Sequence, residues 1–181
     1  MKLVISQEDI WALRLMRPST HEIGGSVKLE ENGRIRAIEF LKGSACRDAS
    51  GNLLKNTICS VTHPVTPIVI HTHPRANRPS SGDLRNAVEG NNTHLLVTPA
   101  GLWLYKAKPS AVEEWHKKTS SEKRRCKLEW RFVGHRQQRN TQSGNTAPFE
   151  SFCESCGFSI AYIPFTETSA NPANKTWTIE L

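Results

Sequence analysis

The stretch that decides how this chain folds and what it can bind is residues 67–83, PIVIHTHPRANRPSSGD. It begins with a short β-branched run, which is typical of a buried strand, and passes directly into His71 and His73. Pro74 then ends the strand, because proline cannot donate a ladder hydrogen bond and favours extended geometry in the residue before it. The stretch therefore predicts a buried strand that ends in two histidines.

Asp83 follows ten residues after His73, at the junction between a loop rich in breaker residues and an expected helix. Two imidazoles and one carboxylate leave a tetrahedral Zn²⁺ with one open position, which is the requirement for a catalytic rather than a structural site. Two plainer interpretations stay open. A His-x-His at a strand end also occurs as polar surface, and Ser80 with Asp83 forms a capping box, which fixes the start of a helix with or without a metal.

The combined pattern resembles the signature of the JAMM (MPN+) metalloproteases: His-x-His-Pro, a short loop and Ser-x-x-Asp, with a glutamate well upstream that is often followed by glycines. Here Glu22 stands just before a glycine pair and matches that glutamate. The resemblance covers roughly residues 1–120. It departs from the family in one respect. Five residues separate the proline from the serine, one fewer than is usual, so Ser81 stays an alternative to Ser80.

Membership of this family implies a zinc-dependent metallopeptidase with one catalytic Zn²⁺ bound by His71, His73 and Asp83. It also implies that Glu22 is the general base and acid for a metal-activated water, and that the Ser80 hydroxyl stabilises the oxyanion. The implied substrate is a peptide or isopeptide bond of ubiquitin or a ubiquitin-like protein. A catalytically silent scaffold is a further alternative, since MPN domains that lack the metal residues serve in that way.

The rest of the sequence predicts an α/β fold, JAMM/MPN-like (cytidine deaminase-like), in which helices flank a mixed β-sheet. Ser6 and Ser110 are the expected N-caps of two of its helices, and Asn32-Gly33 is the expected turn of a hairpin. In chain order we expect helices over residues 6–16, 84–89 and 110–123, and strands over residues 23–30, 35–41, 58–61, 67–70, 94–98 and 102–106.

Breaker residues near the C-terminus suggest how the chain divides. We expect residues 1–135 to form the catalytic domain, residues 136–147 (RQQRNTQSGNTA) to form a polar linker, and residues 148–181 to form a short extension without an assigned role.

Cys153 and Cys156 in this extension are half of a zinc knuckle. No second pair follows, and the candidates to complete it, Cys126 or His135, are irregularly spaced. We therefore expect ordinary thiols, and we interpret His63, His94, His116 and His135 as structural.

Charge is concentrated in one part of this 181-residue chain, whose formal net charge is +7. Residues 117–139 hold nine Lys or Arg and two Glu, so this segment accounts for the whole net charge. It predicts either a solvated face or a patch for nucleic acid or an acidic protein surface. RadC-type proteins, which resemble the same histidine and aspartate pattern and are linked to DNA, supply the alternative function.

The sequence also bears on location. No apolar run approaches the roughly 20 residues that a membrane helix requires, and the first residues lack the uninterrupted apolar region of a signal peptide. The five cysteines are scattered and odd in number, which fits reduced thiols. We therefore expect an intracellular protein without a membrane partner, and the oligomeric state stays open.

Overall fold

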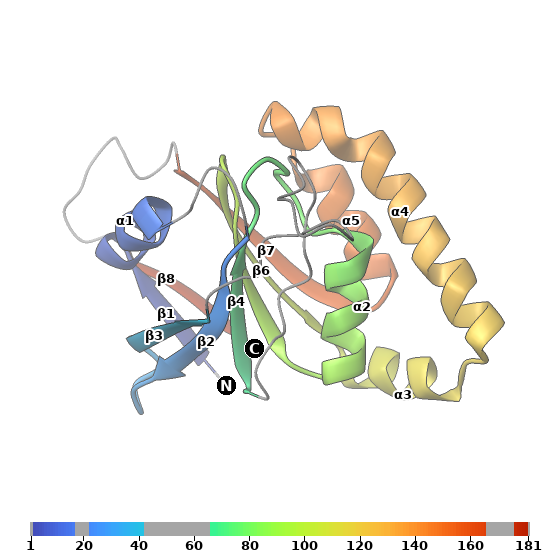
Figure 1. Ribbon diagram of the computed structural model, residues 1–181, viewed down its shortest axis with the longest axis horizontal. Helices are drawn as coiled ribbons and strands as arrows, with labels where there is room; N and C mark the ends of the chain where they lie inside the picture. The colour runs from blue at the N-terminus through green and yellow to red at the C-terminus, as the bar shows by residue number, and fades with distance from the viewer. Residues whose placement is uncertain (1, 17–21, 42–65, 166–175, 181) are drawn as a thin grey trace, which may run out of the picture.

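A computed structural model describes residues 2–16, 22–41, 66–165 and 176–180 (Figure 1). In chain order its elements are β1 (Lys2–Ser6), α1 (Gln7–Met16), β2 (Gly24–Leu29), β3 (Ile35–Leu41), β4 (Ile68–Thr72), α2 (Ser81–Gly90), β5 (Thr93–Val97), β6 (Gly101–Ala107), α3 (Pro109–Lys117), α4 (Ser120–Gln142), α5 (Ala147–Ser155), β7 (Phe158–Pro164) and β8 (Thr176–Glu180).

A mixed six-stranded sheet is the centre of the fold, with strand order β3-β2-β4-β5-β6-β7. Strands β4 and β5 run parallel, and the other described neighbours in this sheet are antiparallel. All five residues of β4 and all five of β5 are buried, as expected for parallel strands that are covered on both faces. The α/β class and the mixed sheet expected from the sequence are confirmed.

Two layers cover this sheet, one on each face (Figure 1). On one side lie α1 and a two-stranded sheet of β1 and β8, and on the other lie α2, α3, α4 and α5. Side chains alternate along each strand, so Ile70 and Leu95 pack toward α1, whereas Leu96 and Trp103 pack toward the helices. The chain therefore has two apolar cores separated by the sheet.

Helix α1 and strands β2 and β3 follow the expected pattern closely, whereas β1 was not expected. Ser6 caps α1, because its backbone N–H donates to Asp9 Oδ2 at 2.8 Å and its Oγ accepts from the Asp9 N–H at 3.1 Å. Strands β2 and β3 form the expected hairpin. Gly33 at its turn has φ +85°, and a Cβ there would lie 2.3 Å from the Lys2 carbonyl oxygen. Only glycine combines that backbone geometry with such a close approach.

The helix expected over residues 110–123 is wrong, because the structure has two helices there. Helix α3 ends at Lys117, and the chain is extended at Lys118 before α4 begins. Thr119 caps α4 in a capping box with Glu122, a Thr-x-x-Glu signal that starts a new helix. Ser110 is not a cap, since it lies inside α3, which begins at Pro109 after an N-cap at Lys108.

The expected linker at residues 136–147 is also wrong. Helix α4 continues through Gln142, and α5 begins at Ala147. The residues beyond it are not an extension: β7 pairs with β6 along seven residues of the central sheet, and β8 pairs with β1. The described parts of the C-terminal segment therefore complete the same fold as residues 1–135. The reason is that a polar helix interior lacks the apolar period that sequence patterns detect.

The strand expected at residues 58–61 lies outside the described residues. Among the helices that the structure does describe, none combines the length and the apolar character needed to cross a bilayer.

Candidate metal centre

His71 and His73 lie where β4 ends, at the face of the sheet that the helices cover. His71 is the fourth residue of β4 and is aligned with Gly24 of β2 and Leu96 of β5. His73 follows the strand, and its N–H donates to the Val97 carbonyl at 2.8 Å. Residues two apart on an extended segment share a face. The two imidazole centroids are accordingly 5.2 Å apart.

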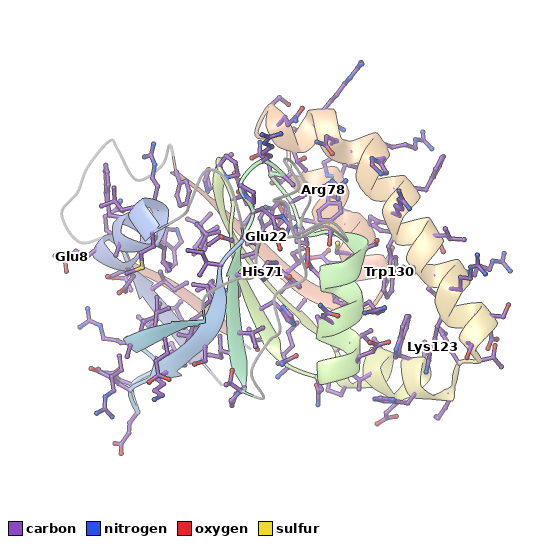
Figure 2. All side chains as sticks on the ribbon, in the orientation of Figure 1. Glu8, Glu22, His71, Arg78, Lys123 and Trp130 are labelled. Carbon is purple, nitrogen blue, oxygen red and sulfur yellow. The ribbon has the colours of Figure 1, made fainter. Side chains whose placement is uncertain are left out.

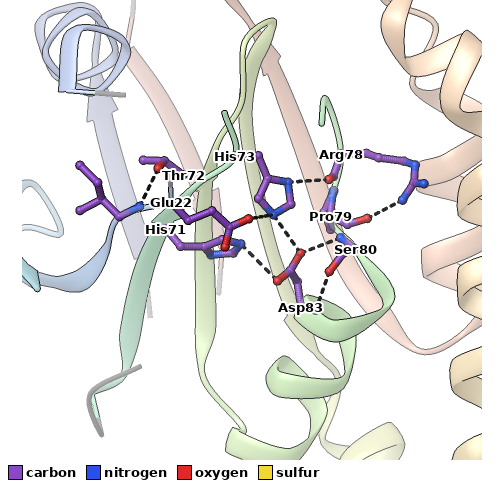
Figure 3. Close-up of polar contacts among 9 residues, drawn as sticks. Glu22, His71, Thr72, His73, Arg78, Pro79, Ser80 and Asp83 are labelled. Atoms are coloured by element: carbon purple, nitrogen blue, oxygen red, sulfur yellow. Dashed lines mark hydrogen bonds and ion pairs between the residues drawn. The ribbon is translucent and has the colours of Figure 1, made fainter. Parts of the chain in front are cut away.

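Asp83 reaches the histidines from the first turn of α2 (Figure 3). Its Oδ1 lies 3.4 Å from His71 Nε2 and its Oδ2 lies 3.3 Å from His73 Nε2. A capping box holds the carboxylate, because the Ser80 N–H donates to Asp83 Oδ2 at 2.6 Å and the Asp83 N–H donates to Ser80 Oγ at 3.2 Å. The capping box predicted from the sequence and the metal triad therefore use the same aspartate.

Glu22 approaches the triad from the opposite side, just before β2 (Figures 2 and 3). Two hydrogen bonds fix its place beside β4: the Ile23 N–H donates to Thr72 Oγ1 at 3.0 Å, and the Thr72 N–H donates to the Ile23 carbonyl at 2.9 Å. Glu22 Oε1 then lies 3.5 Å from His73 Nε2. The carboxylate is thus at the edge of the cluster, facing one of its imidazoles.

The hydrogen bond of His73 decides which of its ring nitrogens faces the cluster. Nδ1 lies 3.1 Å from the Arg78 carbonyl oxygen. Because a carbonyl oxygen can only accept, Nδ1 carries a proton and Nε2 faces the carboxylates of Asp83 and Glu22. A neutral imidazole would present a lone pair to two acceptors there. A proton on Nε2 or a metal cation beside it removes that repulsion.

Burial and neighbouring charges shift the pKa values of Asp83, His73 and Glu22. Burial alone would raise the pKa of Asp83, but the charges and hydrogen bonds of His71 and His73 outweigh it and hold the pKa well below its usual range. Burial alone would lower the pKa of His73, but Asp83 and Glu22 outweigh it and raise the pKa. Burial raises the pKa of Glu22 to about 7. The two carboxylates therefore favour positive charge on His73.

The donor set fits a metal ion. His71, His73 and Asp83 each offer one ligand atom, and these atoms all lie within 4.8 Å of one another. The histidine side chains are 2% and 4% exposed and that of Asp83 is 13% exposed, so solvent meets the group from the start of α2. In the described part of the chain this is the one group of three or more candidate ligands. One ion is what this arrangement can hold.

Ser80 lies at the N-cap of α2 beside Asp83, whereas Ser81 is the first residue of the helix. The capping bond uses Ser80 Oγ as an acceptor, and the hydroxyl proton is left to donate elsewhere. The serine expected as an oxyanion donor is therefore adjacent to the triad.

The other described histidines are not members of the triad. His94 is buried and stacks on Tyr105 with ring centroids 5.1 Å apart, in agreement with a structural role. His116 and His135 are exposed on α3 and α4, and His63 lies outside the described residues.

The three cysteines among the described residues, Cys126, Cys153 and Cys156, are free thiols. Cys153 is fully buried on the inner side of α5, and burial raises its pKa. Cys156 and Cys126 are half-buried and pack against the same helix-side core. Among the described residues, no group of three or more candidate ligands includes these cysteines.

Sequence reasoning missed two residues that shape the site. Thr72, between the two histidines, holds the Glu22 segment through Oγ1. Arg78 supplies the carbonyl that fixes the His73 ring. Neither has a motif of its own, although both lie inside the stretch that carries the ligands. No protein-family model, curated protein or solved structure matches this chain.

Proposed function

We propose that this protein is a zinc-dependent metallopeptidase of the JAMM type that cleaves a peptide or isopeptide bond. The observation that carries the proposal is the convergence of His71 Nε2 and His73 Nε2 on the two oxygens of Asp83, at 3.4 and 3.3 Å, with Glu22 beside them. This geometry unites residues that the sequence keeps up to 61 positions apart. Its members are the ones that the family signature names.

His71, His73 and Asp83 would hold the metal, with two nitrogen donors and one carboxylate. That set suits Zn²⁺, which accepts imidazole and carboxylate ligands in catalytic sites that keep one position open. When bound, the metal supplies Lewis acidity and lowers the pKa of water toward 7. The chain itself supplies ligand geometry: β4 fixes His71, the Arg78 carbonyl orients His73, and the capping box orients Asp83.

Glu22 is the proposed proton carrier. Its Oε1 accepts no hydrogen bond from any residue that the structure describes and lies 3.5 Å from a proposed ligand atom of His73. It is therefore free to take a proton from an attacking water and return it to the leaving amine. The Ser80 hydroxyl donates to the oxyanion that forms at the scissile carbonyl. These roles require no covalent intermediate with the enzyme.

Ubiquitin or a ubiquitin-like protein is the proposed substrate, on the strength of the family resemblance. The experiment measures zinc content by mass spectrometry together with cleavage of a panel of ubiquitin-like fusions. We expect about one zinc per chain and cleavage that stops with a chelator and returns with added Zn²⁺. Cleavage that persists in the chelator would contradict the metal mechanism.

The matched variant is Glu22→Gln. We expect it to keep zinc and to lose about 10²–10⁴-fold in turnover, because the amide cannot accept a proton. Retention of full turnover would remove Glu22 from the mechanism, and loss of zinc would make it a ligand.

A second candidate, nucleic-acid binding, is favoured by the outer face of α4. Leu128 and Phe132 are 57% and 62% exposed there, and the Arg136 guanidinium lies 5.9 Å from the Phe132 ring centroid. Nitrogen-tipped side chains project from this helix away from the sheet (Figure 2). Basic side chains beside an exposed aromatic ring suit phosphates and stacked bases. The exposed basic residues of α4 are Arg124, Arg125, Lys127, Arg131, Arg136 and Arg139.

Fluorescence anisotropy with a labelled single-stranded oligonucleotide tests this candidate. Binding should fall steeply as salt rises, because each neutralised phosphate contributes about −0.7 to the slope of log K against log salt for single strands. Changing Arg124, Arg131 and Arg139 together to Gln should reduce the slope by about two units. Glu22→Gln is the control and should bind unchanged. No binding at low salt would end this candidate.

A further inference from the structure

The loop between Pro74 and Ser80 carries a residue that touches both the metal site and the outer helices. The Arg78 carbonyl accepts from His73 Nδ1 at 3.1 Å. The Arg78 side chain runs the other way, away from the ligands and toward α4 and α5 (Figure 3). One residue thus connects a proposed metal ligand to α4 and α5, two helices that carry none of the ligands.

The guanidinium of Arg78 is fitted to that layer on several sides. Nη1 donates to the Pro79 carbonyl at 3.0 Å, and Nη2 lies 3.5 Å from Gln138 Oε1 on α4. Its Cζ lies 5.7 Å from the centroid of the buried Phe149 ring on α5. Cation–π and hydrogen-bond contacts of a half-buried guanidinium fix its position more firmly than an exposed ion pair does.

Gly134 of α4 makes the space that Arg78 fills. A Cβ at this buried glycine would lie 2.7 Å from Arg78 Nη1 and 2.9 Å from its Cζ, closer than such atoms can approach. A glycine in the middle of a 23-residue helix is unfavourable by itself, and the close approach of Arg78 accounts for it here. The same loop is held a second time by Trp103, whose Nε1 donates to the Asn77 carbonyl at 2.9 Å.

We propose that Arg78 is a positioning residue, which uses its seat at Gly134 and Phe149 to hold the carbonyl that orients His73 toward the metal. This inference rests on the proposed function, because it concerns the ligand geometry of that site. Groups that orient a metal-bound histidine through its second nitrogen change metal affinity by about 10–100-fold. Through Arg78, helices α4 and α5 thereby influence the metal affinity of a site to which they contribute no ligand.

The test uses the full chain and Co²⁺ as the probe, because the visible spectrum of Co²⁺ reports the geometry of its ligands. Arg78→Met keeps the backbone carbonyl and the length of the side chain but removes the guanidinium. We expect Co²⁺ to bind about 10-fold more weakly and its spectrum to shift. Arg75→Met is the matched control, since Arg75 is exposed on the same loop and should leave affinity and spectrum unchanged.

Gly134→Ala tests the packing of Arg78 against α4 without a change of charge. It is the variant to use if Arg78→Met does not fold. Alanine favours a helix interior, so a weaker site in this variant would not reflect a weakened α4. We expect Co²⁺ affinity to fall in the same direction as in Arg78→Met. Ser121→Ala, at an exposed position of the same helix, should bind as the unaltered chain does.

The outcomes separate this inference from the proposed function. If the unaltered chain binds neither Co²⁺ nor Zn²⁺, the metal centre itself is wrong and the inference falls with it. If it binds Co²⁺, and Arg78→Met and Gly134→Ala give the same affinity and spectrum as the unaltered chain, the positioning role alone is overturned. An equal loss of affinity in Arg75→Met would overturn it too, because the charge of the loop would then be the cause.

Discussion

The two faces of the central sheet bury different kinds of side chain. The face packed on α1 and β1 is lined by aliphatic residues such as Ile70 and Leu95, whereas the face under the helices carries His71, His94 and Tyr105 among its aromatic residues. Burial of apolar groups is favourable by itself, but burial of polar groups is costly unless they find partners. Both faces therefore bury an apolar core, and the helix-side face also carries the candidate metal ligands.

Neighbouring residues of β4 give the largest expected contrast between the faces. His71→Ala should lose bound zinc and all measurable cleavage, because two ligands do not hold the ion, while the metal-free fold is kept. Ile70→Ala should lower the free energy of unfolding by about 2–5 kcal/mol through the cavity that it leaves. Urea denaturation in a chelator measures the second effect without the contribution of bound metal.

The control for this pair is zinc per folded chain, which should stay unchanged in Ile70→Ala. The contrast breaks down if His71→Ala destabilises the metal-free protein as much as Ile70→Ala does. In that case the helix-side face would also act mainly as a core.

Ser80 gives the next effect, because it belongs both to the start of α2 and to the proposed chemistry. Ser80→Ala should lower kcat by about 10²–10³-fold through the lost oxyanion donor. It should also lower the free energy of unfolding by about 1 kcal/mol through the lost N-cap. Steady-state kinetics and denaturant unfolding on the same sample separate the two losses.

Ser81→Ala is the matched variant and should change neither quantity by much, since Ser81 is inside the helix. A kcat loss at Ser81 with none at Ser80 would transfer the oxyanion role to Ser81, in line with the shortened loop.

Thr119 gives the smallest effect, at the outer end of the helical layer. Thr119→Ala removes the capping box of α4, in which the Glu122 N–H donates to Thr119 Oγ1 at 3.3 Å. We expect about 1 kcal/mol less stability and no change in Co²⁺ affinity, because this cap is far along α4 from the seat of Arg78 at Gly134. A large fall in metal affinity would show that the whole of α4, rather than that seat, governs the site.

Local patterns were enough to predict α1, β2, β3, β4 and α2. The β-branched run before His71, the Asn-Gly turn at Gly33 and the capping box at Ser80 each depend on residues close in sequence. Local patterns failed at α4, where the buried residues are only Trp130, Gly134 and Thr141. With so few buried positions, the sequence of α4 has no apolar stripe of helical period. For that reason its C-terminal part was predicted to be a polar linker.

The candidate site divides in the same way. The candidate ligands His71, His73 and Asp83 were predictable because they stand in one short stretch of the sequence, in the pattern of the signature that it resembles. The Arg78 seat and the Thr72 hydrogen bond were not, because they depend on contacts with residues 49 to 71 positions away.

By itself, the sequence determined the buried strand, its two terminal histidines and the capped aspartate, because short-range hydrogen bonding and backbone sterics fix those features. Only the tertiary structure decided that the C-terminal segment completes the sheet, that Glu22 faces His73, and that α4 accommodates Arg78 at Gly134. These features depend on strand pairing and packing between segments that are far apart in the sequence. Such contacts form only in the folded protein, and they produce no periodic pattern of residues along the chain.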